Sequence, residues 1–205
     1  MGNKTLKLVG DITGPAALLA FGLALWHYQA SENLFSFAAW GTLDILMGTC
    51  MYYACAKKES VLPIAYGIIA FFVTVMIYRN GKWQWTLVET VCLAGTIIGI
   101  IGWWRLGALF GVVAFGAAMS VASIPILVSN YHNPQTWEWW LWVGGGVSAT
   151  IGLYLTRPLT LQNIGQWLFV AVSAVVTALM LAIQLWPRVW VQIKTPPPGG
   201  VFYFP

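Results

Sequence analysis

The sequence predicts an all-α membrane protein, a single transmembrane domain of residues 1–205 with seven transmembrane helices. Three observations support this prediction. Of the 205 residues, 59% are hydrophobic and 8% are charged, whereas soluble domains contain about 25% charged residues. The chain contains 13 tryptophans, which favour the membrane–water boundary. Finally, the apolar residues fall into stretches of about 20, the length of helix that crosses a hydrocarbon core of about 30 Å.

Charged or turn-forming residues separate seven such stretches. We expect the first three to form one repeat (12–78), the fourth to be a linker helix (85–104), and the last three to form a second repeat (107–186). Residues 187–205 are rich in Pro and Gly and are expected to form an extended tail. The expected spans are 12–29, 35–56, 60–78, 85–104, 107–131, 137–156 and 163–186.

An internal echo indicates that the two three-helix units are copies of one another. His27–Tyr28 matches Asn130–Tyr131 at an offset of 103 residues, and Trp40 matches Trp142 at an offset of 102. Because one linker helix separates the units, both would have the same orientation in the membrane, giving parallel repeats in a 3+1+3 arrangement. The alternative is a chance recurrence of Trp and Tyr, which are common at membrane boundaries.

The charged residues and cysteines exclude several classes of function. The net charge is +4, and all ten basic residues lie at or near expected helix ends, so no nucleic-acid-binding patch is expected. With a cytoplasmic N-terminus, six of these residues lie inside and four outside, a small excess in favour of that orientation. Cys50, Cys55 and Cys92 lie in apolar segments without metal-ligand spacing and are interpreted as small buried residues. No metal or cofactor is expected.

Asp44 is the acidic residue that the sequence places deepest in the membrane. A carboxylate at that depth costs at least about 2.5 kcal/mol if it faces lipid, so Asp44 is expected to face the bundle interior. No Lys or Arg lies in any expected helix core to pair with it. It could serve as a proton relay, as a cation site or as an acceptor for a polar solute. The alternative is a structural hydrogen bond between helices.

Other candidates are weaker. Glu89 lies near the start of the fourth span, where it could reach water and gain from the helix dipole. Glu138 is expected to be an ordinary solvated residue at a helix start. Trp40 and Trp142 lie deeper than boundary tryptophans. Their flat rings suit stacking on a sugar or a heteroaromatic solute, with core packing as the alternative. No catalytic constellation is found, so an enzyme is not expected.

The stretch SIPILVSNYHNPQT (residues 123–136) resembles the signature of the PQ-loop superfamily, which contains the SWEET sugar transporters. Pro125 takes the place of the signature proline, and Asn130–Tyr131 that of its polar-aromatic pair. Ile126 stands where the signature has Gln, and in the first repeat Gly22 stands at the position of Pro125. The segments WTLVETVCLAGTIIGIIGWW and FGAAMSVASIPILVSNYHNP also resemble poorly characterised bacterial proteins of this architecture.

The resemblance implies a small-solute transporter or facilitator in the inner (plasma) membrane of a bacterium, acting on a sugar- or metabolite-sized substrate by alternating access. Pro125 would bend or break its helix and act with Gly22 as a hinge, and Asn130–Tyr131 would contact solute at the end of the pathway. The family's N-terminus lies outside. The alternative function is an accessory, assembly or sensory subunit without transport. The aromatic tail is suited to docking a second copy or a larger membrane complex.

Overall fold

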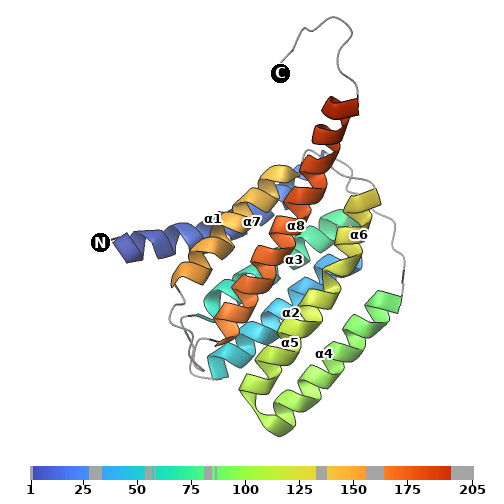
Figure 1. The fold of residues 1–205 in the computed structure, drawn as a ribbon. Coiled ribbons are helices and arrows are strands. Elements are labelled where there is room, and N and C mark those ends of the chain that lie inside the picture. Colours follow the sequence, from blue (N-terminus) through green and yellow to red (C-terminus); the bar gives the residue numbers. More distant parts are fainter. Residues whose placement is uncertain are drawn as a thin grey trace, which may run out of the picture.

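Every regular element in the part of the chain that the structure describes is an α-helix (Figure 1). The computed structural model describes residues 2–27, 34–53, 57, 59–80, 85, 87–132, 138–155 and 164–194. Tyr28, the Pro134–Gln135 pair and residues 195–205 lie outside these ranges. The helices are α1 (Gly2–Ala24), α2 (Leu34–Tyr53), α3 (Val61–Asn80), α4 (Leu87–Leu106), α5 (Ala108–Ala122), α6 (Ile124–His132), α7 (Trp139–Leu155) and α8 (Ile164–Lys194).

Six segments among the described residues are long and apolar enough to cross a membrane, as expected of a multi-pass membrane protein. The predicted all-α membrane class is therefore confirmed. The 17-residue helix α7 falls within the expected stretch 137–156, but is shorter than these six. They are Lys4–Ala24, Leu34–Tyr53, Val61–Arg79, Leu87–Leu106, Ala108–Tyr131 and Trp167–Leu185.

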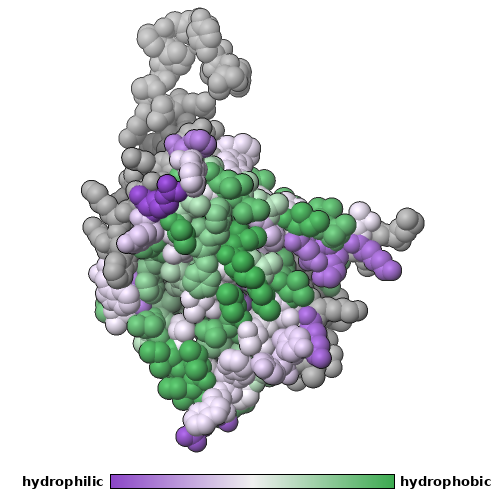
Figure 2. Space-filling model, turned by 180° about the vertical axis from the view of Figure 1, so that it is seen from behind, coloured by the Kyte–Doolittle hydropathy of each residue, from purple (hydrophilic) through white to green (hydrophobic). Residues whose placement is uncertain are grey.

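The outer surface agrees with a lipid environment. Figure 2 shows apolar side chains over much of one face of the molecule, with hydrophilic residues mostly toward its margins. On α4, Leu87 is 77% exposed and Trp104 is 80% exposed. Monomeric soluble proteins rarely expose apolar patches this extensive.

Two helices are longer than the sequence predicts. Helix α1 starts at Gly2 and not near residue 12, because its charged first turns lower hydropathy without preventing a helix. Lys7 and Asp11, one turn apart, even form an ion pair of 2.9 Å between Nζ and Oδ2, a spacing that supports helices. Helix α8 continues to Lys194, so residues 187–194 of the expected extended tail are helical. The run of three prolines begins only at residue 196.

The helix expected to bend or break near Pro125 is interrupted at Ser123, between α5 and α6, although the Ser123 backbone stays in the right-handed helical region, with φ −79° and ψ −19°. The Ser123 N–H donates to the carbonyl oxygen of Met119 at 3.1 Å, and its Oγ donates to the same oxygen at 2.9 Å. Pro125 has no N–H with which to continue this ladder. The regular pattern resumes where the Leu127 N–H donates to the Ser123 carbonyl oxygen at 3.1 Å.

Contacts between helices link the first three helices of the chain to the later ones. Helix α1 contacts α3 and α7, and α2 contacts α3 and α5. Helix α8 contacts α5, α6 and α7, whereas α4 packs mainly against α5 at the edge of the bundle (Figure 1). Helices α1 and α7 run antiparallel in close contact, because Gly10 lies beside Ile151 while Gly144 lies beside Ala17.

The buried apolar side chains form two clusters. One joins residues of α2, α3, α4, α5 and α8, and the other joins residues of α1, α2, α3, α6, α7 and α8. Trp40, Tyr66 and Val172 pack against both clusters. The junction of the two cores therefore lies at these three residues, and the cavity described next opens at the same place.

Candidate functional site

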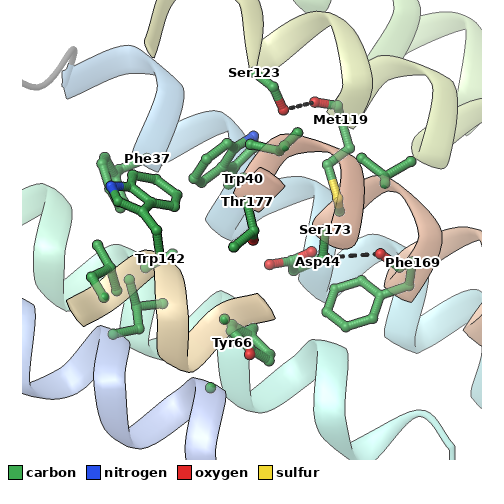
Figure 3. A pocket seen from close by; sticks show the side chains of 17 residues that line it. Phe37, Trp40, Asp44, Tyr66, Met119, Ser123, Trp142, Phe169, Ser173 and Thr177 are labelled. Carbon is green, nitrogen blue, oxygen red and sulfur yellow. Dashed lines mark hydrogen bonds between the residues drawn. The ribbon is translucent and has the colours of Figure 1, made fainter. Parts of the chain in front are cut away.

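A cavity of about 90 Å³ lies where α1, α2, α3, α5, α7 and α8 meet (Figure 3). Its lining is mostly apolar and aromatic, with a few polar side chains. The polar residues other than tryptophan are Asp44, Tyr66, Ser123, Ser173 and Thr177. Ligand sites in proteins commonly combine an apolar lining with a small number of placed polar groups.

Three of the residues predicted to bind solute converge on this cavity. Trp40 and Asp44 come from α2 and Trp142 from α7. Trp40 and Asp44 share a face of α2 because residues four apart in a helix are neighbours. Asp44 and Trp142 are each only 6% exposed. In Figure 3 the two indoles lie on one side of Thr177 and the Asp44 carboxyl group on the other. Asp44 thus faces the bundle interior, as predicted.

Each of these three side chains has a buried polar atom without a hydrogen-bond partner among the described residues. The atoms are the Nε1 groups of Trp40 and Trp142 and Oδ1 of Asp44. No Lys, Arg or His belongs to the described lining. Leaving one such group unsatisfied costs about 1–3 kcal/mol, and most buried polar groups in folded proteins have a partner. The cavity therefore offers two free donors and one free acceptor.

Three of the four hydroxyl groups in the described cavity lining are held by bonds within the protein, those of Ser123, Ser173 and Tyr66. Ser123 Oγ donates to the Met119 carbonyl oxygen, and Ser173 Oγ donates to the Phe169 carbonyl oxygen at 2.8 Å. The Tyr66 hydroxyl shares a hydrogen bond with Ser148, whose Oγ donates to the Gly10 carbonyl oxygen at 2.6 Å. These bonds orient the hydroxyl oxygens and also tie α3 to α1 and α7.

Aromatic contacts fix the orientation of the rings. Phe37 and Trp40 meet edge to face with ring centroids 5.4 Å apart, and Tyr66 and Phe169 meet in the same way at 5.6 Å. Edge-to-face pairs of this kind add about 0.5–1.5 kcal/mol beyond the burial of their area. The aromatic lining is thus a packed wall rather than a set of loose side chains.

The sequence analysis did not single out Tyr66, Phe169, Ser173 or Thr177. One signal in the sequence could have found two of them. Tyr66 and Phe169 are 103 residues apart, the offset of the internal echo, and both line the cavity. Applying the offset to every aromatic residue would have placed this pair beside Trp40 and Trp142.

The remaining predicted binding residues lie elsewhere. Glu89, in the first turn of α4, is fully buried but does not line the cavity. Asn130 is also fully buried outside the lining; its Nδ2 donates to the Ile126 carbonyl oxygen at 3.1 Å, and its Oδ1 accepts a bond from Gln184 Nε2 at 3.4 Å. Tyr131 is 71% exposed. The structure does not bring these three residues to Asp44.

Two further residues from the sequence-based predictions, Gly22 and Glu138, lie in closely packed parts of the structure. Gly22, predicted as a hinge, packs so tightly that an added Cβ would lie 2.7 Å from a ring carbon of Phe72. Glu138 was expected to be solvated but is fully buried. Its carbonyl oxygen accepts a bond from the Leu141 N–H at 3.0 Å, so it belongs to the folded start of α7 and not to an open loop.

The fold and the cavity define a multi-pass α-helical membrane protein with an interior polar and aromatic site. No protein-family model, curated protein or solved structure matches the chain.

Proposed function

We propose that the chain is a small-solute membrane transporter or facilitator, with a sugar- or metabolite-sized substrate and a binding site at Asp44, Trp40 and Trp142. The observation that carries the proposal is the convergence of three unsatisfied buried polar atoms on one cavity. A solute with complementary donors and acceptors would supply the partners that the protein lacks. A purely structural core would be expected to satisfy these atoms itself.

The packing of the helices supports a 3+1+3 arrangement of two parallel repeats. In the first unit α1 contacts α3 and α3 contacts α2; in the second, the broken span α5–α6 contacts α8 and α8 contacts α7. Between the units, α1 contacts α7 and α2 contacts α5. If the two units are exchanged, the contact of α1 with α7 becomes the contact of α5 with α2. A twofold axis along the membrane normal would relate the two contacts in this way. Helix α4 is the linker.

The same arrangement belongs to the PQ-loop and SWEET-like superfamily that the sequence resembles, and membership of this superfamily is part of the proposal. The matching offsets of Trp40 with Trp142 and of Tyr66 with Phe169 support it, because both pairs contribute to one central cavity. In two parallel repeats, equivalent residues approach the axis from opposite sides.

Alternating access between the repeats is the mechanism we propose. The interruption between α5 and α6 at Ser123 lies two residues before Pro125, and Ser123 lines the cavity, so a hinge at this point would move the cavity wall directly. The cavity of about 90 Å³ is smaller than the cavity of about 150 Å³ that holds benzene. A sugar-sized solute therefore requires the helices around it to separate.

The test is solute uptake into proteoliposomes at a series of pH values, with the wild type beside Asp44→Asn. Asparagine keeps the shape of the side chain but cannot ionise, so uptake should be abolished or lose its pH dependence. The matched control is Asp11→Asn, because Asp11 lies in α1, does not line the cavity and pairs with Lys7. Identical curves for wild type and Asp44→Asn would remove Asp44 from the site. Absence of uptake and binding for a broad metabolite panel would overturn transport in favour of an accessory subunit.

A further inference from the structure

We propose that the solute recognised by the cavity is a small organic cation, whose ammonium or guanidinium group sits between the Asp44 carboxylate and the surrounding aromatic rings. This inference rests on the proposed function, because it names the substrate class of the same site. It follows from the charge, the aromatic lining and the size of the cavity.

The described lining of the cavity contains one carboxyl group, that of Asp44, which can carry a negative charge. Only 6% of the surface of Asp44 is exposed, and its Oδ1 atom has no hydrogen-bond partner among the described residues. Of the titratable side chains, only Asp44 and Tyr66 belong to the described lining. A buried carboxylate is costly unless it is paired and hydrogen-bonded. An organic cation would bring both a positive charge and N–H donors.

Aromatic rings form much of the cavity wall around Asp44. Phe37, Trp40, Tyr66, Trp142 and Phe169 all border the cavity that contains Asp44. A cation over an aromatic ring gains about 0.5–2 kcal/mol, with the larger values where water is excluded. A planar guanidinium group can also stack on an indole ring while it donates two hydrogen bonds to a carboxylate.

The rest of the cavity lining disfavours two other classes of ligand, sugars and hard metal cations. It is largely apolar, so the many hydroxyl groups of a sugar would leave water without finding partners, at about 1–3 kcal/mol for each unsatisfied group. A hard metal cation prefers several oxygen ligands, whereas the only carboxylate in the described lining is that of Asp44. The apolar lining residues include Gly14, Leu18, Ala70, Met119, Leu141 and Val172.

The two free indole N–H donors indicate more closely which kind of organic cation the cavity would bind. A cation cannot accept a hydrogen bond, so the Nε1 groups of Trp40 and Trp142 would serve an acceptor atom elsewhere on the same molecule. The volume of about 90 Å³ limits the enclosed group to one smaller than benzene. We therefore expect a compact cationic head group joined to a short acceptor-bearing portion.

The experiment compares guanidinium with urea, which has nearly the same shape but no charge. Binding to the purified full-length protein in detergent is measured by titration calorimetry at millimolar concentrations, far below those that denature proteins. Sodium chloride at the same ionic strength is titrated in parallel. Uptake of radiolabelled guanidinium and urea is then measured in proteoliposomes. We expect guanidinium to bind at least about tenfold more tightly than urea or sodium, a difference of about 1.4 kcal/mol, and to be taken up.

The matched variants are Asp44→Asn and Asp11→Asn, which remove a carboxylate inside and outside the cavity. Asp44→Asn should reduce guanidinium affinity at least about tenfold, and Asp11→Asn should leave it unchanged. The comparison of guanidinium with urea in the wild type needs no variant, so the test survives if Asp44→Asn fails to fold.

The outcomes separate the two proposals. Binding of guanidinium without uptake would uphold the cation site and overturn transport. Asp44-dependent uptake of a neutral solute, with no preference for guanidinium, would overturn the cation site and leave transport standing. Equal affinity for guanidinium, urea and sodium would overturn the cation site, and absence of both binding and uptake for every solute would overturn both proposals.

Discussion

At the scale of single residues, one face of α2 supplies the chemistry of the cavity. Phe37, Trp40 and Asp44 recur at helical spacing, so all three point to the same side. Phe37 orients the Trp40 ring by an edge-to-face contact, and Asp44 follows one turn later. The carboxyl group is therefore held beside an aromatic wall in a place where lipid cannot reach it.

Two substitutions of Trp142 separate the contribution of its aromatic ring to ligand affinity from the contribution of its N–H group. Replacing Trp142 with Phe keeps a six-membered aromatic ring and removes the indole N–H, so guanidinium affinity should fall less than about twofold, below a single cation–π contribution of about 0.5 kcal/mol or more. Replacing Trp142 with Leu removes the ring, and affinity should fall by about 2- to 30-fold, equivalent to about 0.5–2 kcal/mol. Calorimetry of both variants measures the difference. Trp104→Leu is the control, because Trp104 is 80% exposed on α4. Equal losses for Phe and Leu would show that the ring does not contact the cation.

Asn130 tests whether a buried amide acts in binding or in packing. It bonds to Ile126 and Gln184 and lies outside the cavity lining. Asn130→Ala should therefore lower the free energy of unfolding by about 0.6–2 kcal/mol, the range for hydrogen bonds between membrane helices, and leave solute affinity unchanged. Thermal unfolding in detergent and calorimetry measure the two effects. Lost affinity with unchanged stability would instead support the binding role that the sequence resemblance implies.

At the scale of helices, the interruption at Ser123 falls inside a single membrane span, Ala108–Tyr131. Pro125→Ala restores an N–H that can donate to the Val121 carbonyl oxygen. A backbone hydrogen bond contributes about 0.5–1.5 kcal/mol. If the helix bends at Ser123 during transport, this added bond should favour the straight conformation of the helix and slow uptake by about 2- to 10-fold. Thermal unfolding should show a folded, equally or more stable protein.

Pro63→Ala is the control for that measurement. Pro63 lies in the first turn of α3, where a proline costs no hydrogen bond within the helix. Its replacement should leave the uptake rate unchanged. If Pro125→Ala and the wild type transport at the same rate, the break at Ser123 is a fixed bend and not a hinge.

Close contact between α1 and α7 depends on Gly144. A Cβ at this position would lie 2.5 Å from the Cβ of Ala17, so Gly144→Ala should force the helices apart and lower stability by about 1–3 kcal/mol. At Gly95 the nearest atom to an added Cβ is the Cβ of Ala118, at an ordinary distance of 3.5 Å. Gly95→Ala should be neutral or slightly stabilising. Thermal unfolding of the two variants gives the comparison, and equal midpoints would contradict the close approach.

At the scale of the whole molecule, the proposed repeats predict two equivalent contacts, α1 with α7 and α2 with α5. The second can be tested with one substitution, because a Cβ at Gly111 would lie 2.8 Å from Sγ of the native Cys50. Gly111→Cys should therefore form an intramolecular disulfide on mild oxidation, since the two side chains are within bonding reach. Mass spectrometry of the digested protein detects the bond.

Two controls accompany this crosslink. Gly111→Cys combined with Cys50→Ser should form no such bond. Gly95→Cys should not bond to Cys50 either, because the side chain nearest to an added Cβ at Gly95 is that of Ala118. If folded Gly111→Cys protein forms no disulfide with Cys50, the packing of α2 on α5 is contradicted. The proposed exchange symmetry would then lose one of its two contacts.

The sequence by itself determined the class of the protein, the positions of its helices and the inward direction of Asp44. These follow from local properties: the length of each apolar stretch, the charges that separate the stretches, and the cost of exposing a carboxylate to lipid. The break near Pro125 was also predictable, because proline lacks the N–H that a helix needs. The internal echo singled out Trp40 and Trp142 as candidates, and both line the cavity.

Only the tertiary structure decided which face of each helix reaches the cavity. A helix that is apolar all round, such as α3, carries no stripe that marks its buried side, so nothing local separates Tyr66 from residues that face lipid. The same limit applies to Asn130 and Tyr131, adjacent in sequence but one buried and one exposed. Whether a buried polar atom has a partner depends on neighbours far away in the chain, as the bond between Gln184 and Asn130 illustrates. The unsatisfied atoms of Trp40, Asp44 and Trp142 are such a tertiary property.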